Sequence, residues 1–128
     1  MKIVDPAGVP REEVDGAHFT GRATLTRMSG VCEQPQINAY RVTFEPGSRT
    51  AWHTHSGLQI LLVTGGRCRL QKSGEPVRLI PTGGLACILP DERHWHGAEP
   101  EATMTHVALN IDATTTWLDK VTESEYSG

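Results

Sequence analysis

The chain has 128 residues, which is the length of one domain and is enough to bury a core without help from disulfides or a structural metal. Its formal net charge is −3 and no Lys/Arg block is present, so we expect no nucleic-acid partner. The longest apolar runs, such as Ile60–Val63 and Leu85–Leu89, are far shorter than the roughly 20 residues that a membrane helix needs, so we expect no membrane partner.

The three cysteines, Cys32, Cys68 and Cys87, include no CxxC pair. An odd number of cysteines without such spacing argues against a disulfide framework and favours a reducing compartment. The first residues, Met1–Pro6, contain no apolar stretch of the length found in signal peptides. We therefore expect a cytoplasmic protein.

Turn-forming residues recur about every 8–12 residues along the chain, a spacing typical of an all-β sandwich or barrel. The segments between these turns are rich in β-branched residues and leucine, and most of them are too short for helices. The predicted strands are Arg22–Arg27, Ile37–Phe44, Gln59–Thr64, Cys68–Lys72, Val77–Ile80, Ala86–Leu89 and Thr103–Ile111.

Two dipeptides predict particular turns. Pro46-Gly47 favours a type II turn, because proline presets the first central φ and glycine allows the positive second one. Ser73-Gly74 predicts a hairpin tip.

The two ends of the chain favour short helices. Pro10–Val14 predicts one helical turn with proline at its start. Near the C-terminus, a short helix is predicted because Trp117, Leu118 and Val121 would share one helical face.

Histidine is the unusual component, because five of the six histidines lie between positions 53 and 106. His53 and His55 would point to the same face of a strand, whereas in a helix they would diverge by about 200°. Gln59 follows after a turn, and His94-Trp95-His96 repeats the spacing of the first pair. Three imidazoles and an amide oxygen that converge from neighbouring strands predict a mononuclear metal site with open positions.

The stretch Gly47-x5-His53-Thr54-His55-x3-Gln59-x6-Gly66 resembles the first cupin motif, G-x5-H-x-H-x3-4-E-x6-G, in every spacing, with Gln59 where the family usually has Glu. The second motif, G-x5-P-x-G-x2-H-x3-N, is matched more loosely. Gly84-x5-Pro90 fits it, but Glu92 replaces the usual Gly, the histidine comes one residue early and Asn is absent. We take His94 as the ligand from this motif and keep His96 as the alternative.

This resemblance implies an all-β fold, a cupin jelly-roll β-barrel with a single domain over residues 1–128. The motif core would span about residues 36–112, and residues 113–128 would form a short C-terminal helix or tail. A small-molecule substrate is the expected partner. Because small cupins are often dimers, we also expect a homodimer or a higher homo-oligomer.

Three further segments, Thr43–His55, His94–Ala98 and Met104–His106, resemble those of small single-domain bacterial cupins that include manganese-dependent hydroxynitrile lyases. The resemblance implies one divalent transition metal, with manganese first and iron, zinc, nickel or cobalt as alternatives. It also implies that His106 stands near the metal as a base. The implied metal ligands are His53, His55, Gln59 and His94.

Gln59 alters the chemistry of the predicted site because it brings no negative charge. Three neutral imidazoles and an amide leave the charge of a divalent ion uncompensated, so such an ion should bind an anion strongly and lower the pKa of bound water. This donor set favours Lewis-acid or anion-transfer chemistry and does not exclude dioxygen activation by Fe(II).

Strand alternation predicts the walls of a substrate pocket. Tyr40 and Val42 lie on the apolar side of their strand, which lines the barrel in a cupin. Cys87 and Asn110 are further candidate wall residues. His96 shares a face with His94 and is a second candidate acid or base.

The strand Thr103–Ile111 can be read in two orientations. Periodicity alone turns its more apolar face, with Val107 and Leu109, toward the interior and leaves His106 in solvent. The family resemblance implies the reverse, and we favour that orientation, with His106 inside and the apolar face packed against another sheet or a partner subunit.

The leading functional prediction is a metal-dependent small-molecule enzyme that resembles the hydroxynitrile lyases. In that reaction the metal would hold the cyanohydrin or the departing cyanide, and His106 would take the hydroxyl proton. The alternatives are an Fe(II)-dependent cupin dioxygenase and a non-catalytic cupin that binds a metal or a small anion.

Overall fold

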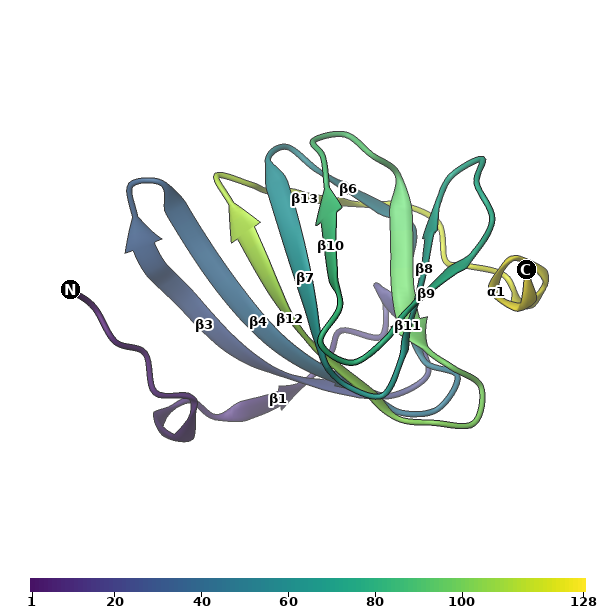
Figure 1. The fold of residues 1–128 in the computed structure, drawn as a ribbon, viewed down its shortest axis with the longest axis horizontal. Coiled ribbons are helices and arrows are strands. Elements are labelled where there is room, and N and C mark those ends of the chain that lie inside the picture. The colour runs from purple at the N-terminus through teal and green to yellow at the C-terminus, as the bar shows by residue number, and fades with distance from the viewer.

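The structure, a computed structural model that describes residues 1–128, consists of two antiparallel β-sheets that face each other as a barrel (Figure 1). The first sheet has the spatial order β1 (Arg11–Glu13), β3 (Ala23–Glu33), β4 (Gln36–Phe44), β12 (Met104–Ile111), β7 (Leu58–Gly65) and β10 (Leu85–Ile88). The second has the order β13 (Thr115–Trp117), β6 (His53–His55), β11 (His94–Ala98), β5 (Arg49–Thr50) and β2 (Phe19–Thr20), and β8 (Cys68–Lys72) and β9 (Arg78–Ile80) extend it beside β11. This architecture confirms the predicted all-β jelly-roll barrel with a single domain.

The predicted strands are all present, and β8 has the predicted bounds. The largest difference concerns β3, which continues to Glu33, well beyond the predicted end at Arg27. Its pairing with β4 shifts register between Met28 and Cys32, so a bulge interrupts the alternation there. A period-2 pattern cannot be followed through such a bulge, which is why the sequence predicted only the first part of the strand.

The helical turn predicted at Pro10–Val14 is wrong. Arg11–Glu13 forms β1, which pairs with β3 and so obtains backbone partners for an exposed segment. A short 3-10 helix, η1, lies earlier, at Pro6–Gly8, where the Asp5 carboxylate accepts a hydrogen bond from the backbone N–H of Ala7.

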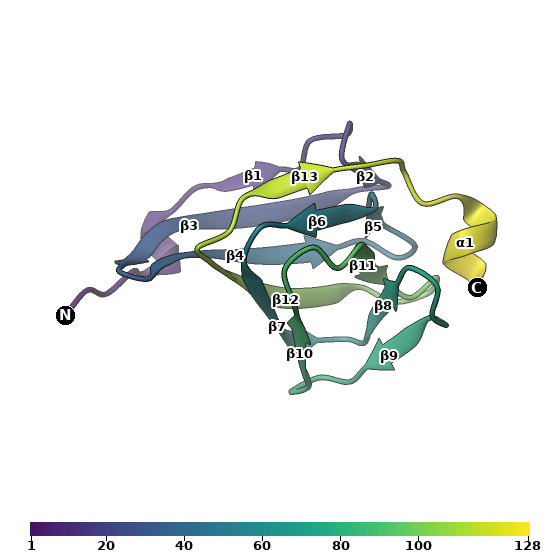
Figure 2. The same cartoon turned by 90° about the horizontal axis from the view of Figure 1, so that it is seen from above.

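The predicted C-terminal helix is present but begins later than expected. Trp117 belongs to β13, because Thr115–Trp117 pairs with His53–His55. Helix α1 spans Glu123–Ser127 and starts at a capping box formed by Thr122 and Glu125. The buried apolar contacts of the tail are made instead by Val121 and Tyr126, which pack with Trp52 and Trp95. In Figure 2, α1 lies at one end of the barrel and the N-terminus at the other. Neither helix has the length and apolar character needed to cross a membrane.

Both predicted turns are confirmed. Gly47 has a φ of +78°, and the backbone N–H of Ser48 donates to the carbonyl of Glu45 at 3.0 Å, as in a type II turn. Gly74 has a φ of +84°, and Glu75 closes the hairpin tip by donating to the carbonyl of Lys72 at 3.0 Å.

The barrel interior has an apolar part and a polar part. The apolar part is built around fully buried Phe44, Val63 and Met104, and burying a side chain of that size contributes roughly 1.5–3 kcal/mol. The polar part contains five of the six histidines, all of them buried. The fold therefore sets a polar site against a dry apolar core.

The structure shows which of the two predicted orientations of β12 is right. The residues of this strand alternate between buried and half-buried, and His106 and Asn110 belong to the buried set. Val107 and Leu109 lie on the outer face of the first sheet. The orientation implied by the family resemblance is thus confirmed, and the one that periodicity favoured is wrong, because this sheet also carries apolar residues on its outer face.

Candidate metal centre

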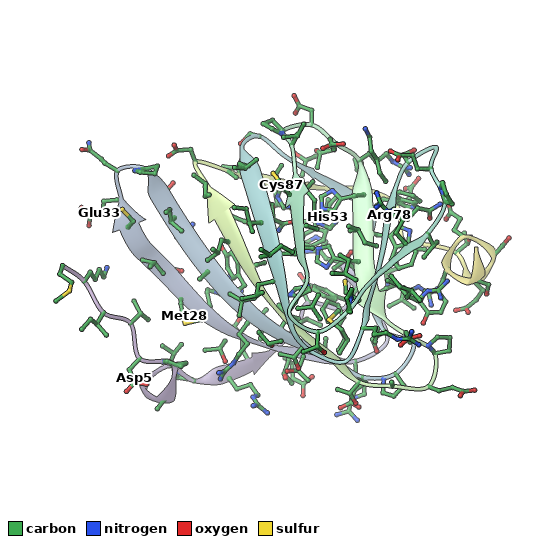
Figure 3. All side chains as sticks on the ribbon, in the orientation of Figure 1. Asp5, Met28, Glu33, His53, Arg78 and Cys87 are labelled. Carbon is green, nitrogen blue, oxygen red and sulfur yellow. The ribbon has the colours of Figure 1, made fainter.

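Six polar side chains from four strands meet inside the barrel, where Figure 3 labels His53. His53 lies directly opposite His94 in the pairing of β6 with β11, so the two HxH pairs are neighbours in one sheet. The other contributing strands, β7 and β12, belong to the facing sheet. None of the six is more than 5% exposed: His53 and His55 on β6, Gln59 on β7, His94 and His96 on β11, and His106 on β12.

Backbone carbonyls fix the protons of two imidazoles. Nδ1 of His53 lies 2.8 Å from the carbonyl of Ala51, and Nδ1 of His94 lies 2.8 Å from the carbonyl of Glu92. Because a carbonyl oxygen can only accept, each Nδ1 must donate, and a neutral ring then has a lone pair at Nε2. Burial lowers the pKa of His94 to about 4 and that of His53 well below its usual range, so both rings are neutral at neutral pH.

His55 is oriented from the C-terminal strand β13. Its Nδ1 lies 3.0 Å from the Thr115 hydroxyl, and its Nε2 is buried without a protein partner. Burial lowers its pKa as well. A buried nitrogen with no partner is costly unless something else binds it, and a metal ion would.

Gln59 completes the donor set with its amide oxygen. Its NH2 group donates to the Asn110 side-chain oxygen at 2.9 Å, which leaves Oε1 facing Nε2 of His94 at 3.3 Å. Nε2 of His94 has no proton, so two lone pairs face each other across this distance. A cation between them would replace that repulsion with two attractions, and the residues therefore fit a divalent metal.

His96 also reaches the centre. Donor atoms of His53, His94 and His96 lie within 4.8 Å of one another. The ring of His96 is centred 5.3 Å from that of His53 and 5.7 Å from that of His94. The corresponding distances for His55 are 5.0 and 5.3 Å. The structure thus brings together the four predicted ligands and adds the alternative residue beside them.

His96 and His106 form a buried pair. Nε2 of His106 lies 3.0 Å from Nδ1 of His96, and the outer nitrogens, Nδ1 of His106 and Nε2 of His96, are buried without protein partners. Burial lowers the pKa of His106 to about 4 and that of His96 well below its usual range. Both rings are therefore neutral with one N–H each, and one of these N–H groups lies in the hydrogen bond between them.

A cavity of about 390 Å³ opens onto this centre. The predicted wall residues Tyr40, Val42 and Asn110 all line it, together with the candidate base His106. A cavity of this size and mixed lining suits a small organic ligand.

The wall prediction for Cys87 is corrected by the structure. Cys87 is exposed on the edge strand β10, outside the residues that line this cavity (Figure 3). It pairs with Ile60, which follows inward-facing Gln59 on β7 and so faces the other way. Cys87 instead borders a separate cavity of about 230 Å³ that touches His94.

Several residues at the cavity mouth were not predicted from the sequence. His18 and Trp117 stack with ring centroids 4.6 Å apart, and both line the cavity. Arg27 lies over the Tyr40 ring at 5.6 Å. No local signal in the sequence indicates this place for His18, because it depends on the pairing of the next two residues, β2, with β5.

Comparisons with known proteins place this chain among the cupins. The model of the AraC-like ligand binding domain family matches residues 38–128. An (R)-mandelonitrile lyase from Granulicella tundricola is 39% identical over 111 residues, which cover 84% of this chain and 85% of that protein. A cupin-like protein from Thermotoga maritima has a TM-score of 0.85 at 35% identity, over 91% of this chain and 92% of its own. The polyketide cyclase RemF from Streptomyces resistomycificus shares the fold, with a TM-score of 0.73 at 18% identity over 99% and 91% of the chains.

Proposed function

This chain belongs to the AraC-like ligand binding domain family of cupin proteins, and we propose that it is a metal-dependent lyase that cleaves and forms cyanohydrins. The observation that carries the proposal is the contact between the unprotonated Nε2 of His94 and the amide oxygen of Gln59, which calls for a cation. The 39% identity to a mandelonitrile lyase supports the choice of reaction.

We assign the metal to His53, His55, Gln59 and His94. The Nδ1 atoms of the three histidines all contact oxygen atoms, which leaves each Nε2 as the nitrogen available to a metal. His96 differs, because its Nδ1 contacts another imidazole. A bound divalent metal would supply Lewis-acid chemistry, a positive charge that stabilises anionic oxygen or cyanide.

His106 is the proposed base. We assign the proton between the two rings to His106, so that its Nε2–H donates to Nδ1 of His96. Its own Nδ1, which has no protein partner, then keeps a lone pair. In cleavage, Nδ1 takes the hydroxyl proton of the cyanohydrin, the O–H electrons form the carbonyl and the C–C bond electrons leave with cyanide. The proton then passes from His106 to cyanide, so that hydrogen cyanide and an aldehyde are the products.

The cavity walls support an aromatic substrate. Phe19, Tyr40, Phe44 and Trp117 all line the space in front of His106. Aromatic side chains favour contact with another ring through edge-to-face or offset packing. We therefore propose mandelonitrile as the first substrate to test.

The experiment measures benzaldehyde release from mandelonitrile by the Mn²⁺-loaded protein. We expect turnover that is lost after chelation, and a fall in kcat of about 100-fold or more for His106→Ala, the range that a general base contributes. Val107→Ala is the matched control. Val107 follows His106 on β12 and faces outward, so its substitution should leave kcat unchanged.

The same preparation discriminates the alternatives. If the Fe²⁺-loaded protein takes up oxygen and the Mn²⁺-loaded protein releases no cyanide, the lyase proposal is contradicted and a dioxygenase is supported. Tight metal binding with neither reaction would support a non-catalytic binding protein.

A further inference from the structure

We propose that Asn110 is a positioning residue that makes Gln59 a metal ligand, by holding its amide in the one orientation that points the oxygen toward the histidines. This inference rests on the proposed metal centre. It concerns the feature in which this chain departs from the usual cupin motif, an amide in place of a carboxylate.

The two amides face each other across neighbouring strands. Gln59 on β7 lies directly opposite Asn110 on β12 in the antiparallel pairing. Both side chains point into the barrel, and they are 3% and 7% exposed. The NH2 group of Gln59 donates to Oδ1 of Asn110 at 2.9 Å, and this bond is buried.

An amide can bind a metal only through its oxygen, so its orientation matters. If the Gln59 amide turned by half a rotation, its NH2 group would face Nε2 of His94, which has a lone pair and would accept the hydrogen bond. In the absence of metal, the rotated form would therefore gain a hydrogen bond from the Gln59 NH2 group to His94. The rotated form would also place the Gln59 oxygen against Oδ1 of Asn110, so it requires the Asn110 amide to turn as well.

A glutamate at position 59 would need no such support. Both carboxylate oxygens are acceptors, so either orientation offers an oxygen to the metal. The dependence on Asn110 is therefore a consequence of the glutamine. It predicts an energetic coupling between positions 59 and 110 that can be measured as metal affinity.

The experiment is a double-mutant cycle on metal-stripped protein titrated with Mn²⁺ in a calorimeter. We expect Asn110→Leu, which removes the acceptor and keeps the branching of the side chain, to weaken Mn²⁺ binding by about 10–100-fold, the usual effect of losing a partner of a metal ligand. In the Gln59→Glu background, the same substitution should change the affinity by less than about threefold. Asn110→Asp keeps the acceptor and should bind Mn²⁺ at least as tightly as the wild type.

Each outcome is decisive. An equal loss in both backgrounds, or no loss with Gln59 present, would overturn the assignment of Asn110 alone. Wild-type protein that binds no Mn²⁺ would overturn the proposed function and this assignment together. Thermal unfolding of the metal-free variants controls for folding, and Asn110→Ala replaces Asn110→Leu in the cycle if the leucine variant does not fold.

Discussion

Each proposed ligand histidine is oriented by the oxygen that its Nδ1 atom touches. Two of these oxygens are backbone carbonyls, from Ala51 and Glu92, and the third is the hydroxyl of Thr115. Such partners fix the tautomer of a metal-binding imidazole and the direction of its free nitrogen. His96 has an imidazole partner instead, so its tautomer follows that of His106. In the proposed function, this difference separates the residues assigned to the metal from those assigned to proton transfer.

His55 and His96 give this distinction a direct test, because both rings lie close to His53 and His94. We expect His55→Ala to lose Mn²⁺ affinity by more than about tenfold, since it removes a ligand. His96→Ala should keep most of the Mn²⁺ affinity and lose turnover, since it removes the partner of His106. Calorimetric titration and mandelonitrile kinetics on both variants provide the measurement. Loss of metal in His96→Ala with retention in His55→Ala would reverse the ligand assignment.

Strand β13 shows how a short element completes the site. It has three residues, Thr115–Trp117, and pairs with the ligand strand β6. Thr115 contacts Nδ1 of His55, and Trp117 stacks on His18 at the cavity mouth. The C-terminal segment thus orients one histidine of the candidate metal centre and lines the cavity beside it.

A hydroxyl deletion on this strand tests that role. Thr115→Val keeps the shape of the side chain but removes the partner of His55, so we expect Mn²⁺ affinity to fall by about tenfold or more. Thr116→Val is the matched control, because Thr116 is exposed on the opposite face of β13 and its replacement should leave Mn²⁺ affinity at the wild-type value. Equal effects of the two substitutions on metal binding would contradict the role of Thr115.

The whole molecule buries its titratable histidines in one interior, which couples stability to pH. Burial lowers the folded-state pKa of His94 and of His106 from the usual 6.5 to about 4. The unfolded chain therefore binds more protons between these values, so stability is complete above about pH 6.5 and falls as the pH drops toward about 4. Figure 3 shows the interior position of His53, a third ring of this kind.

We expect the metal-free protein to lose on the order of 2 kcal/mol of unfolding free energy per histidine between about pH 7.5 and pH 5. Urea unfolding at the two pH values measures this loss. His106→Leu removes one of the groups, so its unfolding free energy should depend less steeply on pH. A stability that is independent of pH in this window would show that the rings take up protons as readily in the folded state as in the unfolded chain.

The oligomeric state of the protein, a homodimer or a higher homo-oligomer, stays a prediction. The outer face of β12 carries half-buried Val107, Leu109 and Ile111. The family resemblance implies that a second copy of the chain packs against this face.

The fold class and most of the site could be predicted from local patterns. The HxH spacing places two imidazoles on one face of any strand, and the cupin motif spacing relates them to Gln59 and His94. Both are properties of short segments, so they can be recognised without knowledge of the rest of the chain. The turns at Pro46-Gly47 and Ser73-Gly74 belong to the same class, since φ preferences are local.

Only the tertiary structure decided that β13 is a strand and that Cys87 lies outside the larger cavity. It also confirmed the inward face of β12 that the family resemblance implied and periodicity opposed. It also brought His18 to the mouth and placed Asn110 against Gln59. These outcomes depend on strands that pair across long stretches of chain and on a sheet with apolar residues on both faces. Alternation along one strand shows which residues share a face, but the partner across the barrel decides which face is inside.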